Sequence, residues 1–450
     1  MKKSIYEIIA EAPLDKIAPK YIASYTHTGG ENDIASSPFS DDDSKSHFRV
    51  NKHKNLWFDY AMNIGGNSIN LLQQLYNLSY RQAAKKVVTD SPELFPGVDL
   101  KNFNFGSTRK DRINAIHPKQ NPVLTDLAFR CLMNIAYLTS ADRRMLHNER
   151  HLSDTEIKKY GLFSMPACTT KMRKKLAEFV TSNGGDMKIF RYVPGFFEYK
   201  GQTYWNYGFA KGIAIPAKDI HNRIMGIQIR LENPISDTRY IWLSSANVKP
   251  IKKGNNYFLH GQSVAKDFKA EYGTGVGTPI ATFDDGYTDQ DLMITEGFFK
   301  GVQYHKLFHC KVAALPGVGS FKNLKEIFDY YDNVDNVLSY GKNQHHTLRA
   351  ICIGYDADTV TTPQVFHSEC RLYDYIRKYT DIPVNVITWD KKYGKGFDDL
   401  VFAHPTSYQQ YLTVMPFTEF KAAHISLWKD FQMKQKAALK DRIAKEKSRA

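Results

Sequence analysis

Apolar runs and helical stretches alternate between residues 291 and 400, and this alternation constrains the fold more than any other feature of the chain. LMIT precedes a helical stretch at 298–308, VAAL one at 321–331, AICIGYD one at 364–378, and NVITWD a loop. Such alternation is typical of a mostly parallel sheet with helices on its faces. We therefore expect an α/β fold here, within a chain that is α+β overall.

Other patterns divide the rest of the chain. Two strand-like runs at 47–51 and 55–60 precede a helical pattern at 68–88, and later segments are first helical, then rich in strands and glycine. Five parts follow from these patterns: an N-terminal module at 1–90, a linker at 91–122, a helical segment with a basic strand-rich subdomain at 123–290, the α/β domain at 291–404, and a basic helical tail at 405–450.

The amino-acid composition limits the cell compartment and the binding partners that we expect for this chain. The chain has 61 Lys and Arg against 47 Asp and Glu, a net charge of +14, which favours a polyanionic partner such as nucleic acid. Its five cysteines are widely spaced and form no CxxC pair, as expected in a reducing cytoplasm. Glu7 and Glu11 interrupt the first apolar stretch, so we expect no secretory signal, and no run is apolar enough to predict a membrane span.

Acidic residues follow successive strands of the predicted sheet. Glu296 follows LMIT, Asp356 and Asp358 end AICIGYDAD, and Asp398 and Asp399 lie in GKGFDDL. Sites in open α/β sheets form beyond the carboxyl ends of strands, and residues i and i+2 of an extended chain project to the same side. Such carboxylates suit Mg²⁺ or Mn²⁺. The alternative is that these acids only cap the helices that follow.

The segments LMITEGFFKG, GYDAD and GKGFDDL resemble, in this order, a Toprim domain, the metal-binding fold of bacterial-type primases, of type IA and type II topoisomerases and of some nucleases. The resemblance implies that Glu296, Asp356 and Asp358 carry metal ions and catalysis. Asp398 matches the acid of the third primase motif, and the four acids are therefore the expected catalytic residues and metal ligands.

Two departures from the primase pattern leave the number of metal ions open. Lys300 stands where primases usually place an acid, and the DxD motif lacks the usual Ala-Gly after it. Lys300 and Lys395 are therefore expected to contact phosphate instead.

The segment GIAIPAKDIHNRIMGIQIRL, with RYIWLSS after it, resembles the basic polymerase subdomain of bacterial-type primases. The resemblance carries over to Arg223, Arg230, Arg239 and one of Ser244 and Ser245. Guanidinium groups bind phosphate oxygens through paired donors, so these arginines are expected to hold nucleotide or template. Alternatively, they only border a solvated sheet.

The N-terminal module resembles the zinc module of primases but has lost the ligands. Ser37, Ser40, Trp57 and Tyr60 occupy the four ligand positions, and structural zinc needs thiolate or imidazole ligands, so we expect no zinc. The fold is then expected to depend on aromatic packing under the 68–88 helix, by Phe39, Phe48, Trp57 and Phe58.

A basic turn in this module is a candidate contact for single-stranded DNA. Phosphate contacts and base stacking are expected from Arg49, Lys52, His53 and Lys54 together with Trp57. A solvated basic turn is the alternative. Elsewhere, HNERH at 147–151 is expected to be a polar helix face, and the glycine-rich GTGVGT at 273–278 a flexible turn, since it lacks the context of a nucleotide-binding loop.

These resemblances imply a bacterial-type (DnaG-like) DNA primase of a phage, plasmid or other mobile element. It would use Mg²⁺ or Mn²⁺ and nucleoside triphosphates to make short RNA primers on single-stranded DNA, with a replicative helicase as a further candidate partner of the basic tail. Two alternatives remain open: a Toprim-bearing accessory protein that binds single strands without polymerising, and a Toprim nuclease. A topoisomerase is the least favoured, because no tyrosine stands in a recognisable strand-breaking segment.

Overall fold

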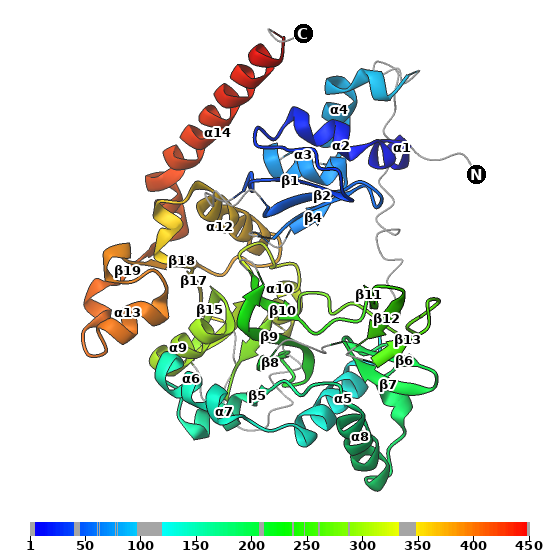
Figure 1. Ribbon diagram of the computed structural model, residues 1–450. Helices are drawn as coiled ribbons and strands as arrows, with labels where there is room; N and C mark the ends of the chain where they lie inside the picture. The colour runs from blue at the N-terminus through cyan, green and yellow to red at the C-terminus, as the bar shows by residue number, and fades with distance from the viewer. Residues whose placement is uncertain are drawn as a thin grey trace. The chain divides into compact units, whose positions relative to one another are not determined.

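The computed structural model describes residues 5–39, 46–96, 119–206, 211–332 and 348–447, apart from positions 61, 63, 77, 79, 236–237, 247, 260–261 and 287–288. The chain forms two compact units (Figure 1). Unit 1 comprises Met1–Lys110, Gly317–Phe321 and Ala350–Ala450, and unit 2 comprises Asp111–Pro316 and Lys322–Arg349. Each unit is described by itself below.

The N-terminal part of unit 1 is a small antiparallel sheet with helices. Its elements are α1 (Ile5–Glu11), α2 (Leu14–Ile17), β1 (Asn32–Ala35), β2 (Phe48–Asn51), β3 (Leu56–Asp59), β4 (Ile64–Gly66), α3 (Ser68–Tyr76) and α4 (Tyr80–Asp90). The four strands pair in sequence order. The single helix predicted at 68–88 is wrong: α3 ends at Tyr76 and α4 begins at Tyr80. Asn and Ser, which stand in the sequence between these two helices, have lower helix propensity than the Leu, Gln, Ala and Lys residues on either side.

Aromatic side chains form the core of this module, as predicted. Phe48 stacks on Trp57 at 5.3 Å between ring centroids, and Phe39 lies 5.6 Å from the same ring. All three are buried, whereas Phe58 is 37% exposed. The expected core role of Phe58 is therefore wrong, because it alternates with the buried Trp57 along β3 and lies on the other face of the sheet.

The C-terminal part of unit 1 carries a parallel strand pair. Its elements are β17 (Ala350–Gly354), η5 (Ala357–Val360), α12 (Pro363–Ile376), β18 (Val384–Thr388), α13 (Phe397–Ala403), β19 (Thr413–Pro416) and α14 (Phe417–Lys447). β17 and β18 are parallel, and β19 is antiparallel to β18. Helix α14 packs on α12, where the rings of Trp428 and His367 stack at 4.0 Å.

Unit 2 begins with helices and continues into strands, as the sequence predicts. Helices α5 (Pro122–Ile135), α6 (Ser140–Arg150), α7 (Asp154–Tyr160) and α8 (Thr170–Ser182) precede most of the strands. One sheet has the order β10-β9-β8-β5, built from β5 (Phe163–Ser164), β8 (Gly212–Lys218), β9 (Ile224–Ile235) and β10 (Thr238–Trp242). Two smaller sheets contain β6 (Phe196–Tyr199) with β7 (Gln202–Trp205), and β11 (Ile251–Lys253) with β12 (Asn256–Leu259) and β13 (Gln262–Val264).

The last elements of unit 2 again combine strands with helices. They are β14 (Ala281–Phe283), β15 (Asp289–Glu296), α9 (Phe298–Phe308), β16 (Cys310–Leu315) and α10 (Leu324–Asp332). β15 and β16 are parallel, and β14 is antiparallel to β16. The mixed α/β class predicted from the sequence is therefore confirmed, with parallel pairs where strands alternate with helices.

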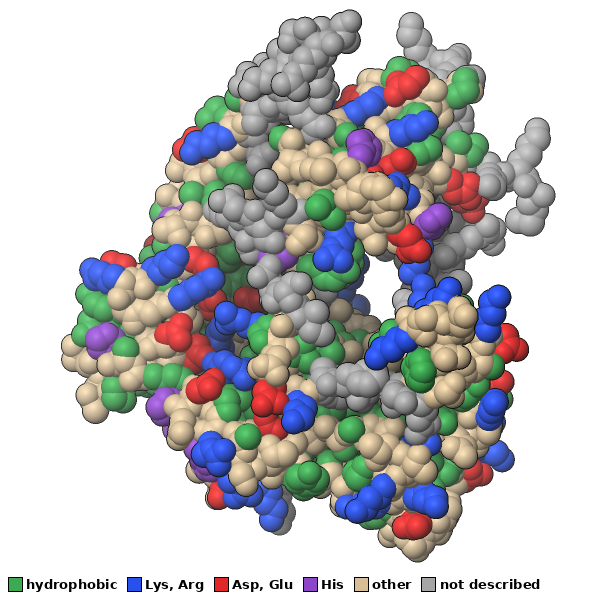
Figure 2. Space-filling model, in the orientation of Figure 1, with side chains coloured by type: hydrophobic (Ala, Val, Ile, Leu, Met, Phe, Trp, Pro, Cys, Tyr) green, Lys and Arg blue, Asp and Glu red, His purple; other side chains and the backbone are tan. Residues whose placement is uncertain are grey.

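Within the described residues, none of the helices combines the length and the apolar character that a membrane span requires. On the face drawn in Figure 2, Lys and Arg side chains lie among Asp and Glu side chains. The net positive charge is therefore not gathered into one uniform patch on that face.

Candidate active site

Three of the predicted acids follow two neighbouring parallel strands. β17 and β18 pair in register from Ile351 with Val384, and both end at the same edge. After β17 the chain reaches Asp356 and Asp358, and after β18 it reaches Asp398 in the first turn of α13. We call these three residues the acidic edge.

The two segments of the acidic edge are joined directly. The backbone N–H of Ala357 donates to the carbonyl oxygen of Lys395 at 2.9 Å. Lys395 Nζ also lies 3.0 Å from Asp358 Oδ2, with 57% of the lysine side chain exposed and only 13% of the aspartate side chain. Asp398 is buried. A largely exposed lysine therefore pairs with a carboxylate that is itself mostly buried.

Helix capping by acids is seen at Asp399 but not at Asp356. Asp356 precedes η5 but makes no side-chain cap bond there. At α13 the cap comes from Asp399, whose Oδ2 accepts the N–H of Gly396 at 2.9 Å. Asp398 is thus the neighbour of the residue that caps α13.

The turn that carries Asp358 is fixed from several sides. Its carbonyl oxygen accepts the N–H groups of Thr361 and Thr362 at 3.0 and 2.7 Å. The next residue, Thr359, donates its hydroxyl to Glu369 Oε2 at 2.5 Å. Glu369 is fully buried, and burial raises its pKa to about 8, despite the opposing effect of the bond from Thr359. A neutral carboxylic acid therefore holds the turn at neutral pH.

Sequence reasoning missed Glu369. The signal was present, because Glu369 falls on the apolar stripe of α12, with Phe366 and Cys370 beside it and Leu372 and Ile376 further along. A carboxyl group on such a stripe is buried and must either be paired or neutral.

The fourth predicted acid lies in unit 2. Glu296 is the last residue of β15 and pairs with Leu315 of β16. Lys300, in the first turn of α9, places Nζ 4.0 Å from Glu296 Oε2. The lysine that replaces the usual primase acid therefore partly neutralises Glu296.

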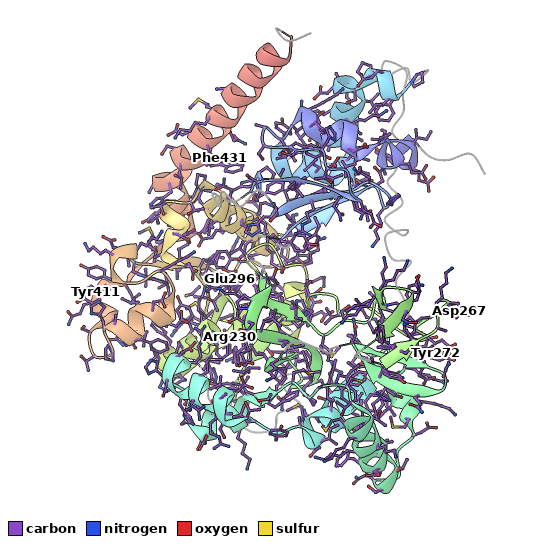
Figure 3. All side chains as sticks on the ribbon, viewed as in Figure 1. Arg230, Asp267, Tyr272, Glu296, Tyr411 and Phe431 are labelled. Carbon is purple, nitrogen blue, oxygen red and sulfur yellow. The ribbon has the colours of Figure 1, made fainter. Side chains whose placement is uncertain are left out.

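The arginines of unit 2 are held by acids. Arg223 donates to Asp219 Oδ2 at 2.8 Å from Nε and lies 2.7 Å from it through NH2. Arg230 NH2 lies 3.2 Å from Glu149 Oε2. Figure 3 labels Arg230 on β9 together with Glu296. Since a guanidinium has five donors, each of these pairs leaves further donors for a ligand.

Arg239 and the candidate serines behave differently from these paired arginines. Arg239 is exposed on β10. Ser245 is buried, donates its hydroxyl to the carbonyl of Thr274 at 3.1 Å and accepts the N–H of Thr274 at 3.0 Å. Ser245 therefore secures a loop.

Some residues in and around the basic turn of the N-terminal module make contacts within the fold. Arg49 lies 5.1 Å above the ring of Tyr60. Trp57 is 1% exposed and donates its indole N–H to the carbonyl of Asn67 at 2.9 Å. The predicted stacking of Trp57 on DNA bases is wrong, because its ring fills the core. Lys54 is exposed.

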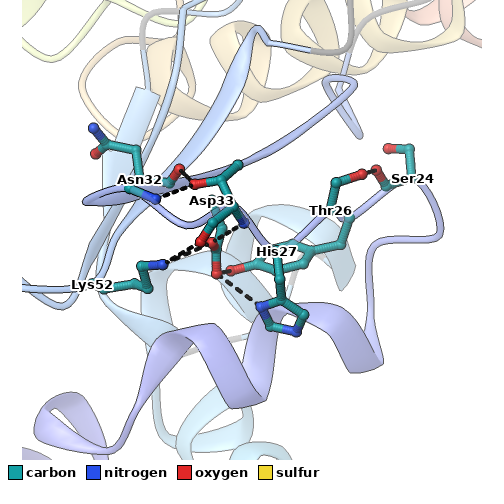
Figure 4. A network of polar contacts seen from close by, with 9 residues as sticks. Ser24, Thr26, His27, Asn32, Asp33 and Lys52 are labelled. Carbon is teal, nitrogen blue, oxygen red and sulfur yellow. Dashed lines mark hydrogen bonds and ion pairs between the residues drawn. The ribbon is translucent and has the colours of Figure 1, made fainter.

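Lys52 belongs to a buried polar network around Asp33 (Figure 4). Asp33 accepts hydrogen bonds from Tyr25 at 3.1 Å, from the N–H of Thr28 at 2.8 Å and from His27 at 2.9 Å, and Lys52 Nζ lies 3.2 Å away. Burial alone would raise the pKa of Asp33, but these donors outweigh burial and lower its pKa below the usual value.

The positions that would hold zinc carry side chains other than cysteine and histidine. Ser37 accepts the N–H of Phe39 at 3.0 Å, Trp57 is in the core, and Tyr60 is 51% exposed. Ser40 lies outside the described residues. Hydroxyl and indole groups are not ligands of structural zinc, so these residues do not fit the ion.

Among the described residues, no three His, Cys, Asp or Glu side chains converge closely enough to hold a metal ion by themselves. The chemistry of the acidic edge nevertheless fits a hard divalent cation, which prefers carboxylate oxygens and keeps several waters. Lys395 supplies positive charge there in this structure.

Two protein-family models match parts of the chain. The CHC2 zinc finger matches residues 1–94, and a domain of unknown function (DUF3854) matches residues 287–408. A search of the curated proteins finds no match. The two family matches thus fall on the N-terminal module and on the segment that contains the predicted acids.

Several solved primase structures are similar to the chain. The zinc-binding and RNA polymerase domains of the Aquifex aeolicus primase are 14% identical, with 99% of this chain and 98% of that chain covered and a TM-score of 0.39. The RNA polymerase domain of Mycobacterium tuberculosis primase DnaG is 12% identical, with 73% and 98% covered and a TM-score of 0.44. A DnaG primase catalytic domain bound to single-stranded DNA is 12% identical, with 65% and 80% covered and a TM-score of 0.39.

Proposed function

We propose that the chain is a DNA primase that synthesises short RNA primers on single-stranded DNA from nucleoside triphosphates, in the replication of a phage, plasmid or other mobile element. One observation carries the proposal: Asp356, Asp358 and Asp398 follow two paired parallel strands, and the bond between Ala357 and Lys395 joins their segments. The ordered primase-like motifs and the CHC2 zinc finger match at 1–94 support it.

In unit 1, Mg²⁺ or Mn²⁺ would be held by Asp356, Asp358 and Asp398. For Glu296, in unit 2, the primase-like motif implies the role of metal ligand or general base. When bound, such an ion neutralises charge on a triphosphate and lowers the pKa of an attacking hydroxyl. Lys395 is suited to exchange its carboxylate partner for phosphate, because its side chain is largely exposed.

Phosphate and template contacts are proposed for Arg223, Arg230 and Arg239, and for Lys300. Arg223 and Arg230 are held in one orientation by Asp219 and Glu149. A guanidinium fixed in this way loses less conformational entropy when it binds phosphate than a free one. Arg49 and Lys54 remain candidates for single-stranded DNA, whereas Lys52 is engaged by Asp33.

We also propose that the N-terminal module folds without zinc. Its support is the side-chain chemistry at Ser37, Trp57 and Tyr60, together with the buried position of Trp57. Metal analysis of the purified full chain tests this part: less than one zinc per ten chains agrees with it, and one zinc per chain overturns it.

A second candidate is a single-strand-binding accessory protein that does not polymerise. The pairing of Lys300 with Glu296 and of Lys395 with Asp358 favours it, because both lysines reduce the negative charge available to a metal ion. A nuclease is the third candidate, and it predicts cleavage in place of synthesis.

One assay separates the three candidates. The full chain is incubated with single-stranded DNA, labelled ribonucleoside triphosphates and Mg²⁺ or Mn²⁺, and the products are separated by length. Short labelled RNA supports a primase. DNA binding without incorporation under either metal indicates the accessory protein, and shortened DNA indicates the nuclease; either result would overturn the proposal.

A further inference from the structure

An open pocket of about 450 Å³ lies in unit 2 and includes none of the four predicted acids. Its walls come from the segment before α5, the turn between β8 and β9, residues 276–282, and the first turn of α10. This volume is within the range of roughly 300–1,000 Å³ that small-molecule sites occupy.

The glycine-rich segment GTGVGT contributes Val276 and Gly277 to one wall of this pocket and packs closely against β9. A Cβ atom at Gly226 of β9 would lie 2.6 Å from Val276 and 3.0 Å from Pro279. The wall can therefore lie against β9 only because residue 226 has no side chain. Asn323, before α10, donates its amide N–H to the carbonyl of Thr278 at 3.0 Å and ties the wall to the helix.

One end of the pocket is cationic. Gly277 has φ +82°, and a Cβ there would lie 2.6 Å from Lys119 Nζ, so the glycine both allows this backbone and admits the ammonium group. Within the described part of the chain, the Lys119 side chain has no ion pair or hydrogen bond. Arg223, clamped by Asp219, lines the same pocket.

The α10 wall is anionic. Glu326 is exposed in the first turn of α10, and the described residues place no ion pair or hydrogen bond on its side chain. The remaining walls combine apolar side chains, among them Met225, Val276 and Ile280, with polar ones such as Thr125 and Thr282. Among the described residues, the pocket thus offers an ammonium group and a carboxylate without ion pairs, with apolar side chains among its walls.

We propose that this pocket binds one nucleotide, with its phosphate at Lys119, its base between the apolar walls and its amino group donating to Glu326. A carboxylate accepts charge-assisted hydrogen bonds from the exocyclic amino groups of adenine, cytosine and guanine, whereas uracil has none. The site therefore favours nucleotides with an amino-bearing base. The proposal concerns binding alone and stands apart from catalysis at the acidic edge.

The test measures binding of AMP, CMP, GMP and UMP to the full chain by equilibrium dialysis, without divalent metal. The Asp356→Ala background excludes a contribution from the acidic edge. We expect saturable binding of the first three nucleotides, about tenfold tighter than that of UMP, since one charge-assisted hydrogen bond corresponds to about this factor.

Two variants locate the bound nucleotide. Lys119→Ala is expected to weaken all four nucleotides about tenfold, and Glu326→Gln to remove the preference over UMP. Asp329→Asn, an exposed change about one turn along the same helix from Glu326, is the matched control and should leave binding unchanged. All three positions are solvent-exposed, and an unchanged thermal midpoint verifies folding.

No saturable binding, or binding that both pocket variants leave intact, would overturn the proposal. If the chain binds nucleotides at this pocket but makes no primers, the proposed nucleotide site is supported and the proposed polymerase function is wrong. If the chain makes primers but binds no nucleotide at this pocket, the polymerase function is supported and the proposed nucleotide site is wrong.

Discussion

The N-terminal module and the acidic edge each contain a buried carboxylate beside a lysine, and the two carboxylates are held very differently. Asp33 receives hydrogen bonds from Tyr25, His27 and Thr28 in addition to its ion pair with Lys52. The side chain of Asp358 has Lys395 as its one partner within the described residues, and that lysine is largely exposed. Asp33 is saturated by several donors and so contributes to the fold, whereas Asp358 is balanced by a single exposed cation, as the proposed metal site requires.

Glu369 extends this comparison to a third buried carboxyl group. It has one hydrogen bond, from Thr359, and its other oxygen has no partner among the described residues. Its pKa rises to about 8, whereas the pKa of Asp33 falls. Burial raises the pKa of both groups, so the donors around Asp33, including the cationic Lys52, decide the direction of its shift.

The largest expected effect is on the zinc-free core. Trp57→Ala should destabilise the N-terminal module by about 3–5 kcal/mol, because it removes a fully buried aromatic side chain. Hydrogen exchange of residues 5–96 in the full chain measures the loss. Phe58→Ala, on the exposed face of the same strand, is the matched control and should cost less than about 1 kcal/mol. Equal losses would contradict an aromatic core centred on Trp57.

Asp33→Asn should cost about 2–3 kcal/mol, since it removes the charge that accepts several hydrogen bonds. The lowered pKa of Asp33 also sets a pH dependence. Its stabilisation is fully present above the unfolded value of about 3.9 and is lost as the pH falls through the folded pKa. Hydrogen exchange measured over a series of acidic pH values follows the stability of the module, and this pH-dependent contribution should be missing in the variant. If the variant and the wild type lose stability equally as the pH falls, the proposed role of the network around Asp33 is wrong.

Glu369→Gln should stabilise unit 1 by about 1–2 kcal/mol at pH 7. Burial opposes the ionisation of Glu369 in the folded chain, whereas glutamine carries no ionisable group. The folded pKa of Glu369 lies above the unfolded value of about 4.3, so its contribution to stability falls as the pH rises from there towards 8. Urea unfolding at pH 5 and pH 8 measures this slope. A variant that keeps the wild-type slope would show that Glu369 is not the group responsible.

The smallest expected effect is at Lys395. Lys395→Met should change the unfolding free energy by only about 0.2–1 kcal/mol, because its ion pair is exposed. Lys52→Met should cost more, since Lys52 is only 30% exposed and also donates to the carbonyl of Thr28. Thermal unfolding of both variants compares them directly. A larger loss of thermal stability in the Lys395 variant than in the Lys52 variant would contradict the view that the Lys52 pair serves the fold more than the Lys395 pair does.

The sequence predicted the parallel α/β elements well, because strand–helix alternation directly reflects burial on both faces of a sheet. It also placed Asp356, Asp358 and Asp398 after adjacent strands. It could not predict that Asp399 caps α13, nor that Lys395 reaches Asp358, because both depend on how two loops meet. Trp57 was expected both in the core and on DNA, and only its three-dimensional packing excludes the second role.

Nucleotide incorporation by an Asp358→Ala variant tests the central claim most directly. The full chain, the variant and two matched acids, Asp390→Ala and Asp33→Asn, are compared for primer synthesis on single-stranded DNA with Mg²⁺. Asp390 is exposed and follows the same β18 strand, where it pairs with Lys392. We predict a loss of about 10³-fold or more at Asp358, equivalent to about 4 kcal/mol of transition-state stabilisation. Asp390→Ala should retain primer synthesis within about threefold of the wild type. Asp33→Asn should do the same when it is assayed below its unfolding temperature. Equal activity of the wild type and the Asp358 variant would contradict the account.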